Sequence, residues 1–300
     1  MLNVIVPTLN AAEEWPSFAQ ALLGCVRPEQ VLIVDSESTD GTADLAREAG
    51  FSLCSVPRAE FNHGGTRQMA ADMLPQAEIL VHMTQDAVLA ETRAMASLVA
   101  AFDDPKIGAA YGRQLPRSGA EAIEAHARRF NYPPASDVRA LACRDRLGIK
   151  TIFISNSFAA YRRSALMEVG GFPRDVIFGE DTLTAANLLL AGYCVAYVAE
   201  ACAYHSHAYS WAQDFKRSFD IGVLHSRERW LLDGFGGAQD EGKRFVISEL
   251  EYLREKDPWQ IPSALARTGL KFAGYRLGRM ESRLTPEVKR QLSMHPRFWA

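Results

Sequence analysis

The stretch EILVHMTQDA, residues 78–87, is an apolar run that stops abruptly at a carboxylate, Asp86. This pattern is typical of a buried strand that delivers an acid to the carboxyl edge of a sheet, where open α/β sheets bind their ligands. Three other segments carry polar groups in the same way: VIVPTLN at 4–10, VLIVDSESTDG at 31–41 and YVAEACAYHSH at 197–207. The repetition predicts a polar-ligand site along one edge of one sheet.

Short apolar strands alternate with helical patterns in the first half of the chain. We expect strands at 2–7, 30–35, 51–56, 78–84 and 107–112, and helices near 12–24, 41–49, 65–74 and 91–102. This alternation predicts a parallel sheet with helices on both faces. Farther along, residues 133–150 lack a clear period and are expected to form a loop or a surface excursion, whereas residues 151–162 should add a strand.

Beyond Ser210 the pattern becomes helical, and basic residues stand beside Trp, Phe and Tyr. Helices are expected at 210–232, 243–256, 262–283 and 286–293. The chain has no internal repeat and no Pro/Gly-rich linker. We therefore predict a main α/β domain at residues 1–209 and a helical C-terminal extension, residues 210–300, that packs on it.

The composition is that of an ordinary globular protein, with 300 residues, 48% of them hydrophobic and 23% charged. A formal net charge of −3 argues against nucleic acid as a partner, since phosphate binding favours a basic surface. Five cysteines without a CxxC pair indicate reduced thiols. The N-terminus has no basic region and reaches Pro7 early, so we expect a first strand rather than a signal peptide. No apolar run reaches the ~20 residues of a membrane-spanning helix.

Asp86 has two interpretations. It can cap the helix that follows, a position that favours Asp. It can also bind a divalent metal, because Mg²⁺ and Mn²⁺ prefer carboxylate oxygen and can bridge phosphates. His205 and His207 alternate on a predicted strand and so point to one face, which makes them metal-site candidates as well as ordinary structural histidines.

Polar residues also end the first two predicted strands. Asp35 and Ser36 follow the second strand, and Pro7, Thr8 and Asn10 follow the first. Such residues form either a turn with a helix cap or a surface that reads a nucleobase and a ribose by hydrogen bonds.

Two further segments open helices. HGGTR at 63–67 has paired glycines that permit close backbone approach, and a helix N-terminus favours anions, so Arg67 either pairs with a diphosphate or lies exposed at a turn. Of Glu180 and Asp181, one acid can complement the helix dipole while the other faces the cleft as a general base. No GxGxxG follows the first strand, which counts against a dinucleotide-binding dehydrogenase.

These pieces occur in a familiar order. The chain resembles the family 2 glycosyltransferases, which have the GT-A fold and transfer a sugar from a nucleotide diphosphate with inversion. The resemblance rests on IVPTLN at 5–10, VDSESTDGT at 34–42, GGTRQ at 64–68, TQDA at 84–87, GGF at 170–172 and GED at 179–181. Other segments are similar to bacterial rhamnosyltransferases: FNHGGTRQ at 61–68, FNYPP at 130–134, SNSFAAYRRSAL at 155–166, HSHAYS at 205–210, FKRSFDIGV at 215–223 and SMHPRFW at 293–299. The implied fold is α/β, a Rossmann-like mixed sheet of GT-A type flanked by helices, with a helical C-terminal extension.

The resemblance also implies roles for matching residues. Asp181 would be the catalytic base, and Asp86 would bind Mg²⁺ or Mn²⁺ as the last acid of the family's DxD motif, helped by His205 or His207. In this chain Thr84 and Gln85 occupy the first two positions of that motif. The implied donor-binding residues are Pro7, Thr8, Asn10, Asp35, Ser36, Arg67, Gln85, Lys216 and Arg217. The implied acceptor-binding residues are Asn156, Glu180 and Trp211.

The implied donor is a nucleotide sugar, dTDP-β-L-rhamnose, and the implied acceptor is a glycan or lipid-linked oligosaccharide of a bacterial surface polysaccharide. The implied location is the cytoplasm, with peripheral contact between the basic, aromatic-rich tail and the inner membrane surface. An amphipathic helix packed on its own domain explains that tail equally well. Three alternatives remain: a UDP-hexose transferase of the same family, a non-catalytic binding scaffold, and a sugar-1-phosphate nucleotidyltransferase. The last should have a glycine-rich basic loop where this chain has PTLNAAEEW at 7–15.

Overall fold

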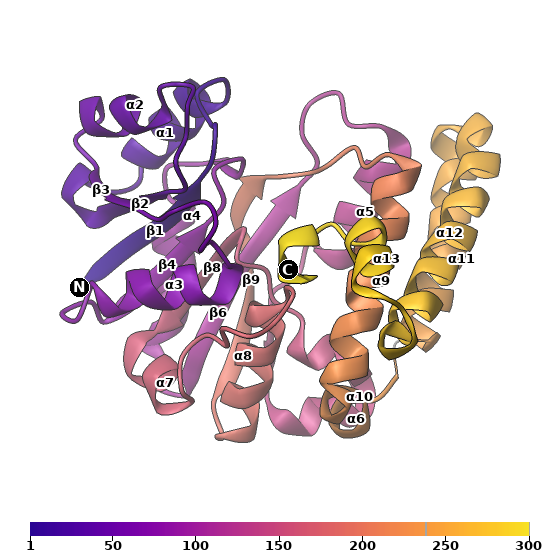
Figure 1. Cartoon of the computed structure of the whole chain (residues 1–300). Coiled ribbons are helices and arrows are strands. Elements are labelled where there is room, and N and C mark those ends of the chain that lie inside the picture. The colour runs from indigo at the N-terminus through magenta and orange to yellow at the C-terminus, as the bar shows by residue number, and fades with distance from the viewer. Residues whose placement is uncertain (238, 300) are drawn as a thin grey trace.

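The computed structural model describes residues 1–237 and 239–299. Within them, nine strands form one sheet in the order β3-β2-β1-β4-β8-β6-β9-β5, and β7 pairs with β9 (Figure 1). The strands are β1 (Leu2–Thr8), β2 (Val31–Asp35), β3 (Ser52–Ser55), β4 (Ile79–Met83), β5 (Val88–Leu89), β6 (Ile107–Leu115), β7 (Asp137–Arg139), β8 (Phe158–Arg162) and β9 (Cys194–Tyr204).

The sheet is mixed. Strands β3, β2, β1 and β4 run parallel, as the alternation of strands and helices predicted. Strand β8 then runs antiparallel between β4 and β6. The helices of the first half are α1 (Trp15–Leu23), α2 (Thr42–Glu48), α3 (His63–Asp72) and α4 (Ala94–Ala100). Because parallel strands end at one edge, the segments that follow β1, β2 and β4 meet there.

Alternating side chains build a core on each face of the sheet. Val4 and Val6 of β1 pack into the core under α1, α2 and α4. Ile5, between them, packs into the opposite core, which α3, α7 (Arg163–Glu168) and α8 (Glu180–Leu190) cover. Both faces are therefore buried, which explains why the central strands read as continuous apolar runs.

Three local predictions were wrong. Residues 133–150 do not form a loop, one of the two alternatives expected for them, because they contain β7 and the short helix α6 (Arg144–Leu147). Residues 151–162 are not one strand, because β8 begins only at Phe158. Strand β9 ends at Tyr204 and does not reach residue 207.

Arg139 shows why sequence periodicity failed at 133–150. Its side chain is buried, and its Nη1 atom donates to the carbonyl oxygens of Lys150 at 2.8 Å and Phe153 at 3.2 Å. The segment is thus ordered by a buried guanidinium and by pairing with β9, neither of which produces a regular apolar period.

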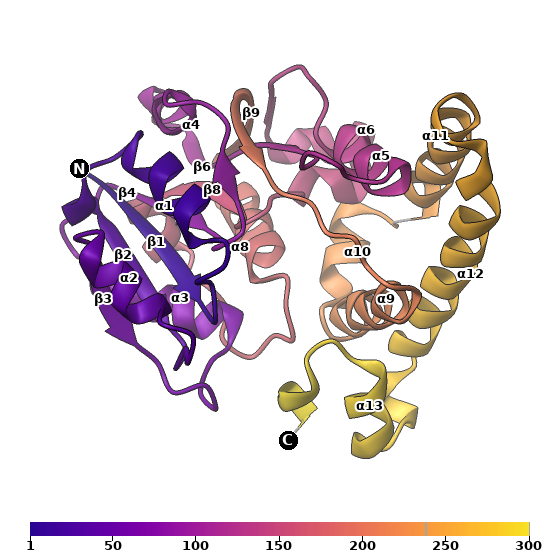
Figure 2. The same ribbon diagram turned by 90° about the horizontal axis from the view of Figure 1, so that it is seen from above.

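The C-terminal part is helical, as predicted. Its described helices are α9 (Trp211–Arg227), α10 (Arg229–Phe235), α11 (Gln239–Lys256), α12 (Ile261–Gly278) and α13 (Pro286–Leu292), and α11 also packs against α5 (Ala122–Asn131). Figures 1 and 2 place α11 and α12 on the side of the molecule opposite β1, β2 and β3. None of the described helices has both the length and the apolar character needed to cross a membrane.

Glycines let α12 touch α9 along the backbone. A methyl group added at Gly274 or Gly278 of α12 would lie 2.4 Å or 2.0 Å from a carbonyl oxygen of α9, at Phe215 or Phe219 respectively. Gly222 of α9 is in the same position relative to α12. Only hydrogen fits at these three points, so α12 is held rigidly on α9.

Candidate active site

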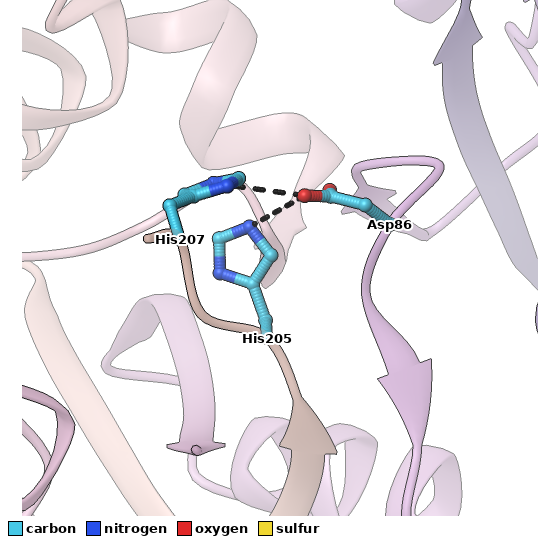
Figure 3. Close-up of side chains that lie close together, drawn as sticks. All are labelled: Asp86, His205 and His207. Carbon is cyan, nitrogen blue, oxygen red and sulfur yellow. Dashed lines mark ion pairs between the residues drawn. The ribbon is translucent and has the colours of Figure 1, made fainter. Parts of the chain in front are cut away.

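Asp86, His205 and His207 come together beyond the ends of β4 and β9 (Figure 3). The Nε2 atoms of His205 and His207 lie 3.3 Å and 3.6 Å from the Oδ2 atom of Asp86. Each residue offers one ligand atom, and these atoms lie within 4.8 Å of one another, close enough to hold one metal ion. Both histidines follow the end of β9, so it is the loop after the strand that turns them toward Asp86. We had expected the alternation of side chains along a strand to do this.

The protonation states around Asp86 suit a metal. Burial opposes ionisation of this carboxyl, but the neighbouring imidazole of His205, and then that of His207, outweigh burial and hold the pKa of Asp86 well below its usual value. Burial, and then the neighbouring His205, lower the pKa of His207 to about 4. Metal ions bind carboxylate and neutral imidazole, the forms that these shifts favour for Asp86 and His207 near neutral pH.

Gln114 of β6 fixes the ring of His205, a contact that the sequence did not predict. The Nε2 atom of Gln114 donates to Ser155 Oγ at 2.9 Å, and its Oε1 atom accepts from Arg128. Oε1 lies 2.9 Å from Nδ1 of His205, and as an acceptor it places the ring proton on Nδ1. The Nε2 atom of His205 faces Oδ2 of Asp86 at 3.3 Å and is the ring nitrogen that can bind a metal ion shared with that carboxylate. Histidine ligands in metal sites are commonly oriented by such a partner.

Gln85, the middle residue of TQD, braces two loops. Its Oε1 atom accepts from the amide of Leu9 at 2.7 Å, and its Nε2 atom donates to the carbonyl of Leu9 at 3.1 Å. We had predicted that Gln85 contacts the sugar donor. Its side-chain amide instead bonds to the backbone of Leu9 through both of its polar atoms. Arg117 braces the same region, since it donates to the carbonyl of Asp86 at 2.6 Å and to the carboxylate of Glu14 at 3.1 Å.

The ends of β1 and β2 meet as the sequence indicated. Thr8, Asp35 and Ser36 are buried there. Thr8 Oγ1 donates to Asp35 Oδ1 at 3.1 Å, and the amide of Ser38 donates to Asp35 Oδ2 at 2.9 Å. Asn10 has a φ of 49° and its side chain accepts from the loop after β2. The two loops are therefore tied into one polar surface.

Asp181 lies in the first turn of α8 and is partly exposed. Its carboxylate oxygens accept from the amides of Asn156 at 3.2 Å and Thr182 at 2.7 Å. Burial, and then the charge of Glu180, raise the pKa of Asp181 to about 6. A carboxylate whose pKa is close to neutral pH is well matched to general-base catalysis.

A buried network of Arg67, Glu180 and Asn156 stands beside Asp181. Arg67 Nη1 lies 2.8 Å from Glu180 Oε1, and both side chains are 5% exposed. Asn156 Nδ2 donates to the same oxygen at 3.0 Å, while its Oδ1 accepts from the hydroxyl of Tyr161 at 2.8 Å. Burial opposes the charge of Glu180, but Arg67 outweighs it and holds the pKa of Glu180 below its usual value.

This network differs from three predicted contacts. We expected Arg67 at the base or the diphosphate of the sugar donor, and Asn156 and Glu180 at the acceptor. Their polar groups instead face one another, because a buried carboxylate and a buried guanidinium are each costly without a partner. The network fixes the charge that Asp181 experiences, since Glu180 raises the pKa of Asp181 and Arg67 opposes it.

The glycines of GGTRQ serve packing. A methyl group at Gly64 would lie 1.7 Å from the carbonyl oxygen of Pro173, so α3 approaches that loop only because Gly64 has no side chain. Gln68 Oε1 accepts from the amide of Phe172 at 2.8 Å. The GGTRQ and GGF segments therefore contact each other, whereas we had expected an anion at this helix N-terminus.

Helix α9 and the C-terminal segment, residues 293–299, border the region of Asp181. The guanidinium of Arg217 lies 6.0 Å from the ring centre of Phe178, in the loop that leads to α8. His295 stacks on the same ring, with 12° between the planes, and meets His63 of α3 edge to face at 5.4 Å. Residues 293–299 were among the segments that resemble bacterial rhamnosyltransferases, but the sequence analysis predicted no role for them.

The C-terminal segment is fixed at several points. Asp220 of α9 accepts from the amide of Met294 at 2.8 Å, and Trp299 is buried. Arg297 donates to the carbonyl of Arg58, in the loop after β3, at 2.6 Å. The segment thus links the helical extension to the half of the molecule that holds β1 and β2.

Three predicted site residues remain to be placed. Pro7 lies in β1 in register with Val34 of β2. Lys216 is half-buried on α9, one residue before Arg217. Trp211, an expected acceptor contact, is the first residue of α9 and is 50% exposed.

Three residues that could hold a metal ion, and a carboxylate with a raised pKa, lie near a polar surface at the ends of β1 and β2. This combination suits one class of chemistry, the movement of a group from a diphosphate to a hydroxyl. Transferases that use nucleotide-activated sugars carry it out. The chain belongs to this class as a member of glycosyl transferase family 2, which its residues 3–170 match. The predicted family and the predicted nucleotide-sugar-dependent enzyme class are confirmed.

Two relatives match along nearly the whole chain. The O-antigen chain rhamnosyltransferase RfbN of Salmonella typhimurium is 43% identical over 300 residues, which cover 99% of this chain and 96% of that protein. The O-antigen chain rhamnosyltransferase WbaN of Salmonella anatum is 41% identical, with 99% of this chain and 95% of that protein covered.

Solved structures share the fold. The mannosyltransferase PcManGT of Pyrobaculum calidifontis, in complex with GDP-Man and Mn²⁺, has a TM-score of 0.56 at 22% identity and covers 99% of this chain and 84% of its own. The glucosyl-3-phosphoglycerate synthase of Mycobacterium tuberculosis, in complex with Mn²⁺, uridine-diphosphate-glucose and glycerol 3-phosphate, has a TM-score of 0.51 at 18% identity and covers 76% of this chain and 79% of its own. The predicted GT-A fold with a helical C-terminal region is confirmed.

Proposed function

We propose that this glycosyltransferase moves L-rhamnose from dTDP-β-L-rhamnose to a hydroxyl of a glycan or lipid-linked oligosaccharide in bacterial surface polysaccharide synthesis. The observation that carries the proposal is the likeness to two O-antigen chain rhamnosyltransferases over 99% of the chain, which includes the C-terminal extension. Calorimetric titration with dTDP-rhamnose, with Mn²⁺ and with EDTA, tests it: we expect saturable binding that EDTA weakens. Absence of dTDP-rhamnose binding in both Mn²⁺ and EDTA would contradict the proposal.

Asp181 acts as the general base in this mechanism. It takes the proton of the acceptor hydroxyl while that oxygen attacks the anomeric carbon from the face opposite the nucleoside diphosphate. The bond to the diphosphate breaks as the new bond forms, so a β-linked donor yields an α-L-rhamnoside. Direct displacement needs no covalent intermediate and no nucleophilic Ser or Cys.

Asp86, His205 and His207 would hold a divalent cation. Two imidazoles favour Mn²⁺ over Mg²⁺, since Mg²⁺ prefers oxygen ligands in a near-ideal octahedron. When bound, the cation neutralises charge that develops on the departing diphosphate. Lys216 and Arg217 of α9 add positive charge for the same purpose.

The remaining donor contacts come from the joined loops after β1 and β2. Thr8, Asp35 and Ser36, with Pro7 and Asn10 beside them, would hold the base and the ribose. We keep the division proposed from the sequence, a GT-A domain at residues 1–209 and a helical extension at residues 210–300. The extension contributes Arg217 and His295 to the site, which supports a single working unit.

Substitution of Gln114 by leucine should weaken Mn²⁺ binding by ~10–100-fold, the usual effect of losing a partner that orients a ligand. The leucine removes the acceptor that keeps the ring proton of His205 on Nδ1. Mn²⁺ titration followed by electron paramagnetic resonance measures the effect. Ser155→Ala is the matched control, because it removes the hydroxyl that accepts the hydrogen bond from Gln114 Nε2 and leaves the contact between Gln114 and His205 in place. It should lower Mn²⁺ affinity much less than Gln114→Leu does. Equal Mn²⁺ affinity in Gln114→Leu and the wild type would count against the assigned tautomer.

The pH profile of kcat/KM should report the ionisation of Asp181. This base works only when it is deprotonated, and its pKa is raised to about 6, so activity should rise as pH increases through about 6 and then level off. Below that pH the rate should fall ~10-fold per unit. Donor affinity measured over the same range serves as the control. A rate that stays flat down to pH 5 would remove Asp181 from the base role.

Replacement of His295 by alanine should lower kcat by ~10-fold, because small displacements of catalytic groups are costly. The imidazole stacks on Phe178, three residues before Asp181. Steady-state kinetics with soluble acceptor measures the change, and Pro296→Ala, the next residue and an exposed one, is the control. Wild-type kcat in His295→Ala would show that the C-terminal segment has no part in positioning the base.

A further inference from the structure

Arg128, in the last turn of α5, is a half-buried cation close to the candidate metal ligands. Its Nη1 atom donates to Gln114 Oε1, and that oxygen lies 2.9 Å from Nδ1 of His205. No Asp or Glu of residues 1–237 and 239–299 forms an ion pair with Arg128, and its buried Nε atom has no hydrogen-bond partner there. Only an amide and, 5.7 Å away, the ring of Tyr132 face this charge. Because a buried charge is costly without a counter-ion, the position calls for an anion.

Arg217 approaches the same region from a second helix, α9. Its guanidinium lies 5.7 Å from the ring centre of Tyr209, whose ring is 5.2 Å from that of His207. Among the described residues, Arg217 also lacks an acidic partner. Burial lowers the pKa of His207, and the positive charges of Arg128 and Arg217 lower it further. Both guanidiniums are therefore within electrostatic reach of one candidate metal ligand.

Tyr132, directly after α5, relates these cations to the general base. Burial raises the pKa of its hydroxyl, and the charge of Asp181 adds to the rise. The charges of Arg128 and Arg217 oppose it. The two cations, the candidate metal ligands and the base thus surround one region, as a sugar attached to a diphosphate requires.

We propose that Arg128 binds the diphosphate of the sugar donor, as one arm of a clamp whose other arm is Arg217. A planar guanidinium can donate to a phosphate oxygen through Nη2 while Nη1 keeps its bond to Gln114. The phosphate groups supply the counter-ion that the protein withholds from both arginines, and the fixed cations stabilise the charge that builds as the diphosphate departs. This assignment rests on the nucleoside diphosphate of the proposed function, and it does not depend on which sugar is transferred.

Calorimetric titration with dTDP, UDP and GDP, in Mn²⁺ and in EDTA, tests the contact. Arg128→Gln should weaken binding of the preferred diphosphate by ~10–100-fold in both conditions, because the lost charge-assisted hydrogen bond does not involve the metal. Arg128→Lys keeps the charge but not the planar fork, so it should lose less affinity. Arg129→Gln is the matched control: the guanidinium of Arg129 lies 5.5 Å from the ring centre of Tyr252, and its replacement should leave binding unchanged.

A second measurement separates a direct contact from an indirect one. Because Arg128 also bonds to Gln114, which orients His205, its replacement would act through the metal site alone if the diphosphate did not touch it. Mn²⁺ titration without nucleotide, followed by electron paramagnetic resonance, should change by no more than a few-fold in Arg128→Gln. A loss of dTDP affinity confined to Mn²⁺, with an equal loss of Mn²⁺ affinity, would make Arg128 a support for His205 and overturn the contact.

Three other results would also overturn it. These are unchanged affinity in Arg128→Gln, an equal loss in Arg129→Gln, and a wild-type protein that binds none of the three diphosphates in EDTA, since unpaired guanidiniums should hold a diphosphate without metal. A preference for UDP or GDP over dTDP would contradict the proposed rhamnosyl donor and leave the role of Arg128 standing. The two proposals therefore fail separately.

Discussion

Asp181→Asn should lower kcat for sugar transfer by ~10²–10⁴, the usual cost of removing a general base. Asparagine has nearly the same shape but cannot take the acceptor proton. Donor affinity should stay within a few-fold of the wild type, because the carboxylate of Asp181 contacts the amides of Asn156 and Thr182 and is not among the predicted donor ligands. Rapid-quench kinetics and calorimetry separate the two quantities.

The Asp181→Asn variant needs a check of its fold. Both carboxylate oxygens accept backbone N–H groups, so the amide NH₂ of asparagine must face one of two donors, at a cost of about 1–3 kcal/mol of stability. Thermal unfolding monitored by circular dichroism measures this loss independently of activity. Transfer within a few-fold of the wild type would exclude Asp181 as the base and turn attention to Glu180.

Asp86→Ala should lower transfer by ~10²–10³, because the departing diphosphate loses the charge that a bound metal supplies. The variant should also weaken binding of the nucleoside diphosphate much more in Mn²⁺ than in EDTA. Equal losses under both conditions would mean that Asp86 is a structural acid. Glu14→Gln is the matched control, since Glu14 shares Arg117 with Asp86 but lies outside the ligand set.

Separate alanine variants of His205 and His207 rank the two imidazoles as metal ligands. His205 is buried and oriented by Gln114, whereas 38% of the His207 side chain is exposed. We therefore expect the larger loss of Mn²⁺ affinity in His205→Ala. A larger loss in His207→Ala would mean that the exposed ring moves onto the metal and becomes its main imidazole ligand.

Most of the fold could be predicted because burial on both faces of a sheet leaves a clear record in sequence. The strands around Val4 and Val31 read as continuous apolar runs, and the structure buries them. Residues 133–150 left no such record, since the buried guanidinium of Arg139 and pairing with β9 hold them. The periodicity of apolar residues reveals which face of a helix or strand is buried. It gives no sign of segments whose structure depends on a few polar contacts.

The site was predicted unevenly for a related reason. Asp86 and the two histidines stand at the ends of apolar strands, so their meeting followed from topology. The partners of Arg67 could not be foreseen, because residues 113 positions apart form its ion pair with Glu180. Gln114 gave no signal at all, since one glutamine inside a strand does not differ from others until its neighbours in space are known.

The central claim is transfer of L-rhamnose with inversion, and a donor competition tests it most directly. Equal concentrations of dTDP-β-L-rhamnose, UDP-glucose, UDP-galactose and GDP-mannose would be offered with Mn²⁺ and a lipid-linked or synthetic glycan acceptor, and the products analysed by mass spectrometry and NMR. We predict that α-L-rhamnoside predominates. Other donors should react only weakly, because a single added hydroxyl costs a modest ~10–200-fold in an apolar contact. A clear preference for a UDP-hexose would contradict the rhamnosyl assignment, and a β-linked rhamnoside would contradict inversion.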